Sequence, residues 1–280
     1  MFAFWKKSSD SFKHSFLIII AYGVAFGIGY LTRLYNPPIH VYYYLSEHDK
    51  IVGYQLNLKD VLDLVFIGPI FTIFSFFLLR RILTHLSENG HTEHKVIFAY
   101  VVFLIAIVLF NYGNIIHVTM NRLNSQIRDE YGTEQVYYSV YYLDEIIGHH
   151  FLTIGFFIIF VENCALHTLN LSKSLDSGDP KILMNPTEKK WNYVFGSLLG
   201  AITAFAYLEG QSAFLFLILN PIFSGLLIIY SLKKKIKIQE NSLLMLFLLM
   251  TVVFSVVTIL WGILFGIKPY YPYFYQNSEL

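Results

Sequence analysis

The chain has 280 residues, of which 55% are hydrophobic and only 14% are charged, and its mean hydropathy is +0.53. Water-soluble domains carry about 25% charged residues, so this composition excludes one and indicates a polytopic membrane protein. The net charge of +1 gives no overall field that would attract nucleic acid. The single cysteine, Cys164, excludes an intrachain disulfide and a cysteine-cluster metal site.

Seven apolar segments have the length, roughly 20 residues, that a helix needs to cross a bilayer. We therefore predict an all-α fold in one domain, residues 1–280, with seven transmembrane helices. In chain order the segments are 16–31, 61–83, 96–118, 140–166, 191–207, 213–232 and 243–267. The basic and apolar N-terminus resembles a signal peptide, but its apolar run is as long as a span, so we predict a retained first helix.

The distribution of basic residues predicts the orientation of these segments. Lysine and arginine gather in the N-terminal tail and in the loops after the second, fourth and sixth segments. Because basic loops stay in the cytoplasm, we predict a multi-pass protein of the cell membrane with its N-terminus inside and its C-terminus outside. Tyrosine-rich stretches at 42–44, 137–142 and 269–275 fall on the predicted outer side, where tyrosine favours the membrane interface.

Three segments carry polar residues at their predicted outer ends. In the third segment, Asn114, His117 and Asn121 fall within roughly 60° of one another on a helix that advances about 100° per residue. The fifth segment ends at Glu209, and the chain then turns directly back into the membrane. These residues should lie at similar depth beneath the outer surface.

The fourth segment begins with the stretch YYLDEIIGHHF, residues 141–151, which contains two acids and two histidines. Glu145 and His149 are four residues apart and stack on one helix face, whereas Asp144 and Gly148 lie on an adjoining face. We expect Gly148 to allow a neighbouring backbone to come close and His149 to meet the polar stripe of the third segment. His150 points about 100° away from His149.

Ionisable residues inside a membrane normally pair, face a cavity or bind a ligand. Two histidines and a carboxylate can hold Zn²⁺ with a position left for water, whose pKa the metal lowers towards 7. The predicted ligands of a divalent metal, most plausibly Zn, are His117, Glu145, His149 and His150.

Further residues complete this hypothesis of a metal-dependent membrane hydrolase. A free acid would transfer protons, and amides would orient a ligand or polarise a carbonyl. The predicted catalytic residues are Asp144 and Glu209, and the predicted ligand-orienting residues are Asn114 and Asn121. The expected substrate is a lipid-like ester or amide, and the expected partners are membrane lipids.

Other interpretations of the polar residues remain open, because Glu-x-x-x-His is not a known metal motif. The cluster could be a hydrogen-bond network that fixes helix packing, or the binding site of a receptor, transporter or membrane-complex subunit. His117 could also ligate haem together with His149 or His150. Asp60 and Asp63 are expected to cap a helix, and Glu162, Cys164 and His167 to be solvated at the inner interface.

The seven spans, the orientation and the membrane-embedded histidine and acid residues resemble in outline the seven-helix zinc amidohydrolases of the adiponectin-receptor and alkaline-ceramidase type. Those families have two histidines spaced four apart on the last span, and the segment 243–267 contains no histidine. No residue role is therefore carried over from them.

Overall fold

A computed structural model of the chain describes residues 8–34, 38–45, 50–88, 93–132, 134–176 and 184–265. Six helical stretches are long and apolar enough to cross a membrane, and they coincide with the second to seventh predicted segments. They are Leu58–Leu86, Glu93–Arg128, Gln135–Ser172, Pro186–Glu209, Ala213–Lys233 and Ser242–Phe265. The chain therefore has the architecture of a helical multi-pass membrane protein. A total of seven spans and the orientation of the termini stay predictions.

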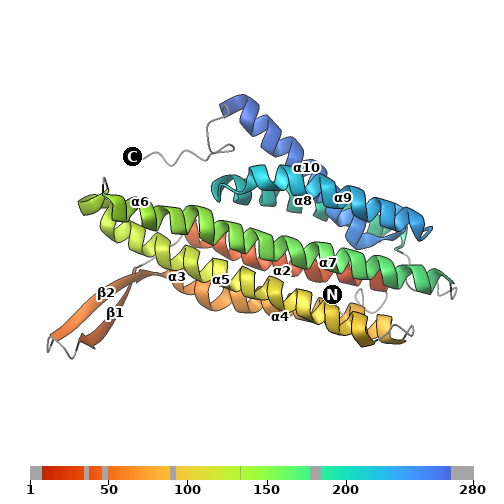
Figure 1. Cartoon of the computed structure of the whole chain (residues 1–280), viewed down its shortest axis with the longest axis horizontal. Coiled ribbons are helices and arrows are strands. Elements are labelled where there is room, and N and C mark those ends of the chain that lie inside the picture. The colour runs from red at the N-terminus through yellow and green to blue at the C-terminus, as the bar shows by residue number, and fades with distance from the viewer. Residues whose placement is uncertain are drawn as a thin grey trace.

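Helix α2, Asp10–Leu34, covers the first predicted segment, and it is followed by a two-stranded hairpin, an addition to the predicted all-α fold. Strands β1, Pro38–Leu45, and β2, Lys50–Asn57, pair antiparallel with Pro38 opposite Asn57. Both strands are rich in the β-branched and aromatic residues that favour extended backbone. Figure 1 shows the hairpin projecting from one end of the helical bundle, which we call the hairpin end.

The second predicted segment is interrupted close to its start. It consists of helix α3, Leu58–Leu62, a π-helical segment η2, Asp63–Ile67, and helix α4, Gly68–Glu88. The backbone N–H of Asn57 donates to the Asp60 carboxylate at 3.1 Å, which confirms the predicted capping role of Asp60. Asp63 instead pairs with Lys59 at 2.7 Å and is only 4% exposed.

The third and fourth predicted segments form a closely packed antiparallel pair. Helix α5 is Glu93–Tyr131, and the following stretch comprises α6, Gln135–Tyr142, the π-helical segment η3, Leu143–Gly148, and α7, His149–Asp176. A Cβ atom on Gly155 would lie 2.5 Å from the carbonyl oxygen of Ala106, and one on Gly113 would overlap the backbone nitrogen of Leu152. Glycine at both positions allows the two backbones to touch.

The remaining helices are α8, Pro186–Glu209, α9, Ala213–Lys233, and α10, Ser242–Phe265, with a short 3-10 turn, η5, at Ile238–Glu240. In Figure 1 these three helices lie along one side of the group formed by α2, α4, α5 and α7. The start of α2 lies at the end of the bundle opposite the hairpin, which we call the N-terminal end (Figure 1).

Burial follows the pattern expected of a protein surrounded by lipid. Aromatic residues from several helices fill the core, and Tyr22 packs on Phe156 with ring centroids 3.5 Å apart. Large apolar side chains also cover the outside, such as Phe98, which is 69% exposed, and Leu104, which is 62% exposed. Such a surface is unfavourable in water and suits the hydrocarbon core of a bilayer.

Candidate functional site

Four of the predicted site residues come together at the hairpin end from α5, η3 and α7: His117, Asp144, Glu145 and His149, which we call the hairpin-end cluster. Nδ1 of His117 lies 2.7 Å from Oδ1 of Asp144. Nδ1 of His149 lies 3.5 Å from Oε2 of Glu145. The two imidazole rings have centroids 4.2 Å apart at an interplanar angle of 42°. The cluster thus contains two imidazole–carboxylate pairs in contact through their rings.

The π-helical segment η3 explains why both pairs form. An α-helix, which advances about 100° per residue, would place Asp144 and His149, five residues apart, on different faces. A π-helix repeats with i→i+5 hydrogen bonds, so residues five apart come onto one side. Asp144 and His149 therefore both reach His117 on α5. Asp144 and Gly148 both face His117, in keeping with their predicted common face, and the π-helical turn brings His149 to the same partner.

Two glycines allow three parts of the chain to converge on the cluster. A Cβ atom on Gly148 would lie 2.9 Å from the backbone nitrogen of His117, which confirms the close approach expected there. A Cβ atom on Gly210, in the turn between α8 and α9, would lie 2.8 Å from Cγ of His149. Beside it, Gln211 has a φ of 51° and its side chain donates to the hydroxyl of Tyr141 at 3.2 Å.

The acids of the cluster are more deeply buried than the rings. Asp144 is 0% exposed and Glu145 is 6% exposed, whereas the side chains of His117 and His149 are 19% and 15% exposed. Nδ1 of His149 also donates to the backbone carbonyl of Glu145 at 3.2 Å. Because a carbonyl oxygen only accepts, the proton of a neutral His149 lies on Nδ1 and its lone pair on Nε2.

The other predicted site residues lie outside these pairs. Nδ2 of Asn114 donates at 2.9 Å to the carbonyl oxygen of Asp63, so it links α5 to η2 instead of facing His117. His150 donates from Nδ1 to the carbonyl of Ile146 in its own helix at 2.6 Å. Asn121 and Glu209 are partly exposed, Asn121 one turn beyond His117 and Glu209 at the last residue of α8.

The described residues contain no group of three or more His, Cys, Asp or Glu side chains arranged to hold one metal ion. Asp144 and Glu145 face the Nδ1 atoms of the histidines, which is where carboxylates orient a ligating imidazole. The side chains that could bind a metal directly in this arrangement are therefore the imidazoles of His117 and His149. Oδ2 of Asp144 is buried and has no hydrogen-bond partner among the described residues.

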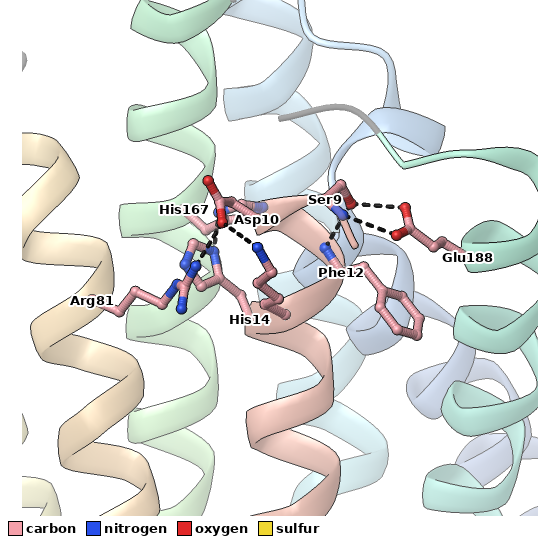
Figure 2. A network of polar contacts seen from close by, with 8 residues as sticks. Ser9, Asp10, Phe12, His14, Arg81, His167 and Glu188 are labelled. Carbon is pink, nitrogen blue, oxygen red and sulfur yellow. Dashed lines mark hydrogen bonds and ion pairs between the residues drawn. The ribbon is translucent and has the colours of Figure 1, made fainter. Parts of the chain in front are cut away.

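A second buried polar network occupies the N-terminal end (Figure 2). His14 and His167 are each 1% exposed, and their Nδ1 atoms lie 3.2 Å apart. Nε2 of His167 lies 3.0 Å from Oγ of Ser11. Cys164 is also buried, with 0% exposure. The expectation that Cys164 and His167 are solvated was therefore wrong. The partners of His167 lie on α2, whose first turn docks against α7.

The same network ties α2 to three further helices. Both Ser9 N–H and Ser9 Oγ donate to the Glu188 carboxylate at 2.9 Å (Figure 2). The side chain of Arg81 on α4 pairs with Asp10 at 2.5 Å, and the hydroxyl of Ser242 on α10 donates to the carbonyl of Ser11 at 2.5 Å.

The contact between Ser11 and His167 resembles a nucleophile and its base in form. Ser11 is nevertheless 0% exposed, and its hydroxyl also accepts the backbone N–H of Ser242 at 3.4 Å. A substrate cannot reach a hydroxyl buried in this way, so the network holds helices together. The polar run SSDSFKH at residues 8–14 was the signal in the sequence, but no sequence pattern connects it with His167.

No protein family model, no curated protein and no solved structure matches the chain. The function is therefore argued from the geometry of the chain itself.

Proposed function

We propose that the chain is a multi-pass protein of the cell membrane that binds a divalent metal ion through His117 and His149 and hydrolyses a lipid ester or amide. The observation that carries the proposal is the contact of two imidazoles, with ring centroids 4.2 Å apart, whose Nδ1 atoms both face buried carboxylates. In the predicted orientation the site lies in the outer leaflet, where lipid headgroups are close.

The physical argument starts from the role of a carboxylate behind a metal-ligating histidine. Such a carboxylate fixes the imidazole tautomer with its proton on Nδ1, turns Nε2 towards the metal and increases its basicity. Asp144 would do this for His117, and Glu145 for His149. His117 and His149 would hold the metal, and a bound metal would activate water for hydrolysis near neutral pH.

Proton transfer in this reaction would use acids near the rings. Asp144 Oδ2 is a buried acceptor without a hydrogen-bond partner among the described residues. Glu209 precedes Gly210, the residue that packs on the His149 ring. Asp144 and Glu209 therefore stay the candidate acid and base, while Asn114 has a structural role through its bond to Asp63.

A second candidate function, proton or solute transfer without a metal, is favoured by a separate observation. Two helices contain π-helical segments, η2 and η3, and both segments contact α5, through Asn114 and His117. Such segments occur frequently at functional sites, and chains of histidine and acid residues carry protons in transporters. In that function the imidazole–carboxylate pairs would exchange protons with one another.

The decisive experiment measures metal content in protein purified without chelators, by inductively coupled plasma mass spectrometry. We expect about one metal ion per chain in the wild type. His117→Ala and His149→Ala should lose the metal and the release of fatty acid from lipid esters or amides. His150→Ala is the matched control, because the His150 ring donates from Nδ1 to a backbone carbonyl of its own helix at 2.6 Å, and this variant should keep both.

The possible results separate the two functions. A metal-free wild type that gains neither metal nor activity when Zn²⁺ is added would exclude the hydrolase. If His149→Ala then abolishes proton-coupled uptake in vesicles while His150→Ala does not, the second function is correct.

A variant of Asp144 tests how the metal would be held. Asp144→Asn keeps the shape of the side chain and removes the charge that faces His117. Loss of such an outer carboxylate typically weakens metal binding about 10–100-fold. Competition with a chelator of known affinity measures this change, and unchanged affinity would show that Asp144 does not orient His117.

A further inference from the structure

A cavity of about 500 Å³ lies between α5, α7 and α9, away from the hairpin-end cluster. This volume is typical of sites for small organic ligands. Most of its wall is apolar and includes Phe98, Ala99, Val102, Phe157, Ile158 and Phe223. Because Phe98 is 69% exposed, the cavity borders the outer surface of the bundle. A ligand dissolved in the bilayer could enter from that side.

One carboxyl group, that of Glu162, lies in this apolar wall. Both of its oxygen atoms are buried and have no hydrogen-bond partner among the described residues. Burying a carboxyl group in an apolar surrounding without a hydrogen-bond partner costs free energy. Glu162 is therefore an unusual residue for a purely structural wall, and a ligand group of opposite charge would satisfy it.

The cationic side chain of the cavity wall that lies nearest to Glu162 is at one end of the cavity. Gly155 packs against Ala106 and Phe110 in the antiparallel α5–α7 pair. Glu162 lies seven residues after Gly155 on α7. Because the helices are antiparallel, it is level with a position on α5 about six residues after Lys95, which corresponds to a distance of about 9 Å along the helix axis. Lys95 and His94 line the cavity at the first turn of α5, and neither bonds to the carboxyl oxygens of Glu162, which have no partner among the described residues. Lys95 and Glu162 therefore line different parts of the cavity, and Glu162 is the charged group beside the apolar wall.

We propose that this cavity binds an amphipathic amine with a single alkyl chain, with the ammonium group at Glu162 and the chain along the apolar wall. A charge-assisted hydrogen bond to an ammonium is about twice as strong as a neutral one and satisfies the buried carboxylate. A fatty acid would place a second acid near Glu162, and an alcohol would supply no positive charge to pair with its carboxylate. The chemistry of the wall and of Glu162 therefore selects the amine.

The experiment uses the full chain in nanodiscs of zwitterionic lipid and measures binding of radiolabelled dodecylamine, dodecanoate and dodecanol by scintillation proximity. We expect saturable binding of dodecylamine that is stronger than that of the other two. Glu162→Gln, which keeps the size of the side chain, should weaken dodecylamine binding about 10-fold or more and leave dodecanol binding unchanged. Glu93→Gln, an exposed acid beside the cavity-lining His94, is the matched control and should have no effect.

Thermal unfolding of Glu162→Gln checks that the variant folds, and Ala165→Phe, which fills part of the cavity, should weaken binding of all three probes. Equal affinity of wild type and Glu162→Gln for dodecylamine would overturn the proposal. A preference for dodecanoate that disappears in Lys95→Ala would also overturn it, in favour of an anionic lipid. Binding that never saturates in the wild type would show partition into the bilayer and no site.

Discussion

The two ends of the helical bundle hold their histidines in opposite ways. At the hairpin end, the side chains of His117 and His149 are 19% and 15% exposed and face carboxylates. At the N-terminal end, His14 and His167 are each 1% exposed and contact each other and a serine. An imidazole that faces an acid and is partly exposed has the arrangement of a metal-ligating histidine, whereas the fully buried pair of His14 and His167 connects helices.

The ends also differ in what brings their helices together. Backbones touch at glycines near the hairpin end, where Gly113, Gly148 and Gly210 leave no space for a Cβ atom. The N-terminal end is joined by side-chain hydrogen bonds, above all those of Glu188 and Ser242. The hairpin end should therefore be sensitive to added atoms and the N-terminal end to lost polar atoms.

The largest effect is expected from added methyl groups between α5 and α7. Gly113→Ala and Gly155→Ala each place a Cβ against backbone atoms that cannot move aside. We expect each to lower the free energy of unfolding by about 3 kcal/mol. Gly225→Ala on α9 is the control, because its Cβ meets nothing within 4 Å. Thermal unfolding in detergent measures the difference. If Gly113→Ala were as stable as Gly225→Ala, the close contact would not hold the pair.

A smaller loss is expected from Glu188→Ala at the N-terminal end. The carboxylate of Glu188 accepts from the buried N–H and hydroxyl of Ser9 and from the backbone N–H of the exposed Asn185 at 3.0 Å, and the two Ser9 donors would be left buried without a partner. Unsatisfied buried donors cost about 1–3 kcal/mol. Metal content should stay unchanged, since the hairpin-end cluster shares no residue with this network.

Glu240→Gln is the control for that experiment. The carboxylate of Glu240 forms a long ion pair, at 3.8 Å, with Lys237, whose side chain is 82% exposed. The free energy of unfolding should therefore change little. Loss of metal in Glu188→Ala would contradict the independence of the two ends.

The apolar segments were predictable from the sequence because hydropathy over about 20 residues is a local property. Six of the seven predicted segments coincide with described candidate spans. The capping role of Asp60 was predictable for the same reason, because it depends on Asn57 three residues earlier. The hairpin at 38–57 was missed, although its β-branched and aromatic residues indicated strands, because the stretch was interpreted as a loop between spans.

The geometry of the two polar clusters was less accessible from the sequence. A constant advance of about 100° per residue cannot anticipate the π-helical turn that brings Asp144 and His149 to the same partner. The N-terminal network joins Ser11 to His167 across 156 positions and Ser9 to Glu188 across 179. No periodicity links residues so far apart, so the burial of His167 required the tertiary structure.

The smallest effect concerns the charge of Asp10, and its pH dependence distinguishes electrostatics from packing at the N-terminal end. Burial alone would raise the pKa of the Asp10 carboxyl, but the hydrogen bonds and charges of Lys13 and Arg81 together lower it below its ordinary value. A lowered folded-state pKa means that ionised Asp10 stabilises the fold above its unfolded pKa of about 3.9, and that this contribution is lost as pH falls through the folded pKa.

Asp10→Asn should therefore lower the midpoint of thermal unfolding slightly at pH 7, and the difference from wild type should shrink as the pH falls below about 4. A small size is expected because the Asp10 side chain is 29% exposed and solvent screens its ion pairs. Thermal unfolding of both proteins across pH 3–7, with Glu93→Gln as a surface control, measures the change. If the difference in unfolding midpoint stayed constant with pH, the lost stability would come from hydrogen-bond geometry. The charge of Asp10 would then contribute no more to the N-terminal end than the buried neutral groups do.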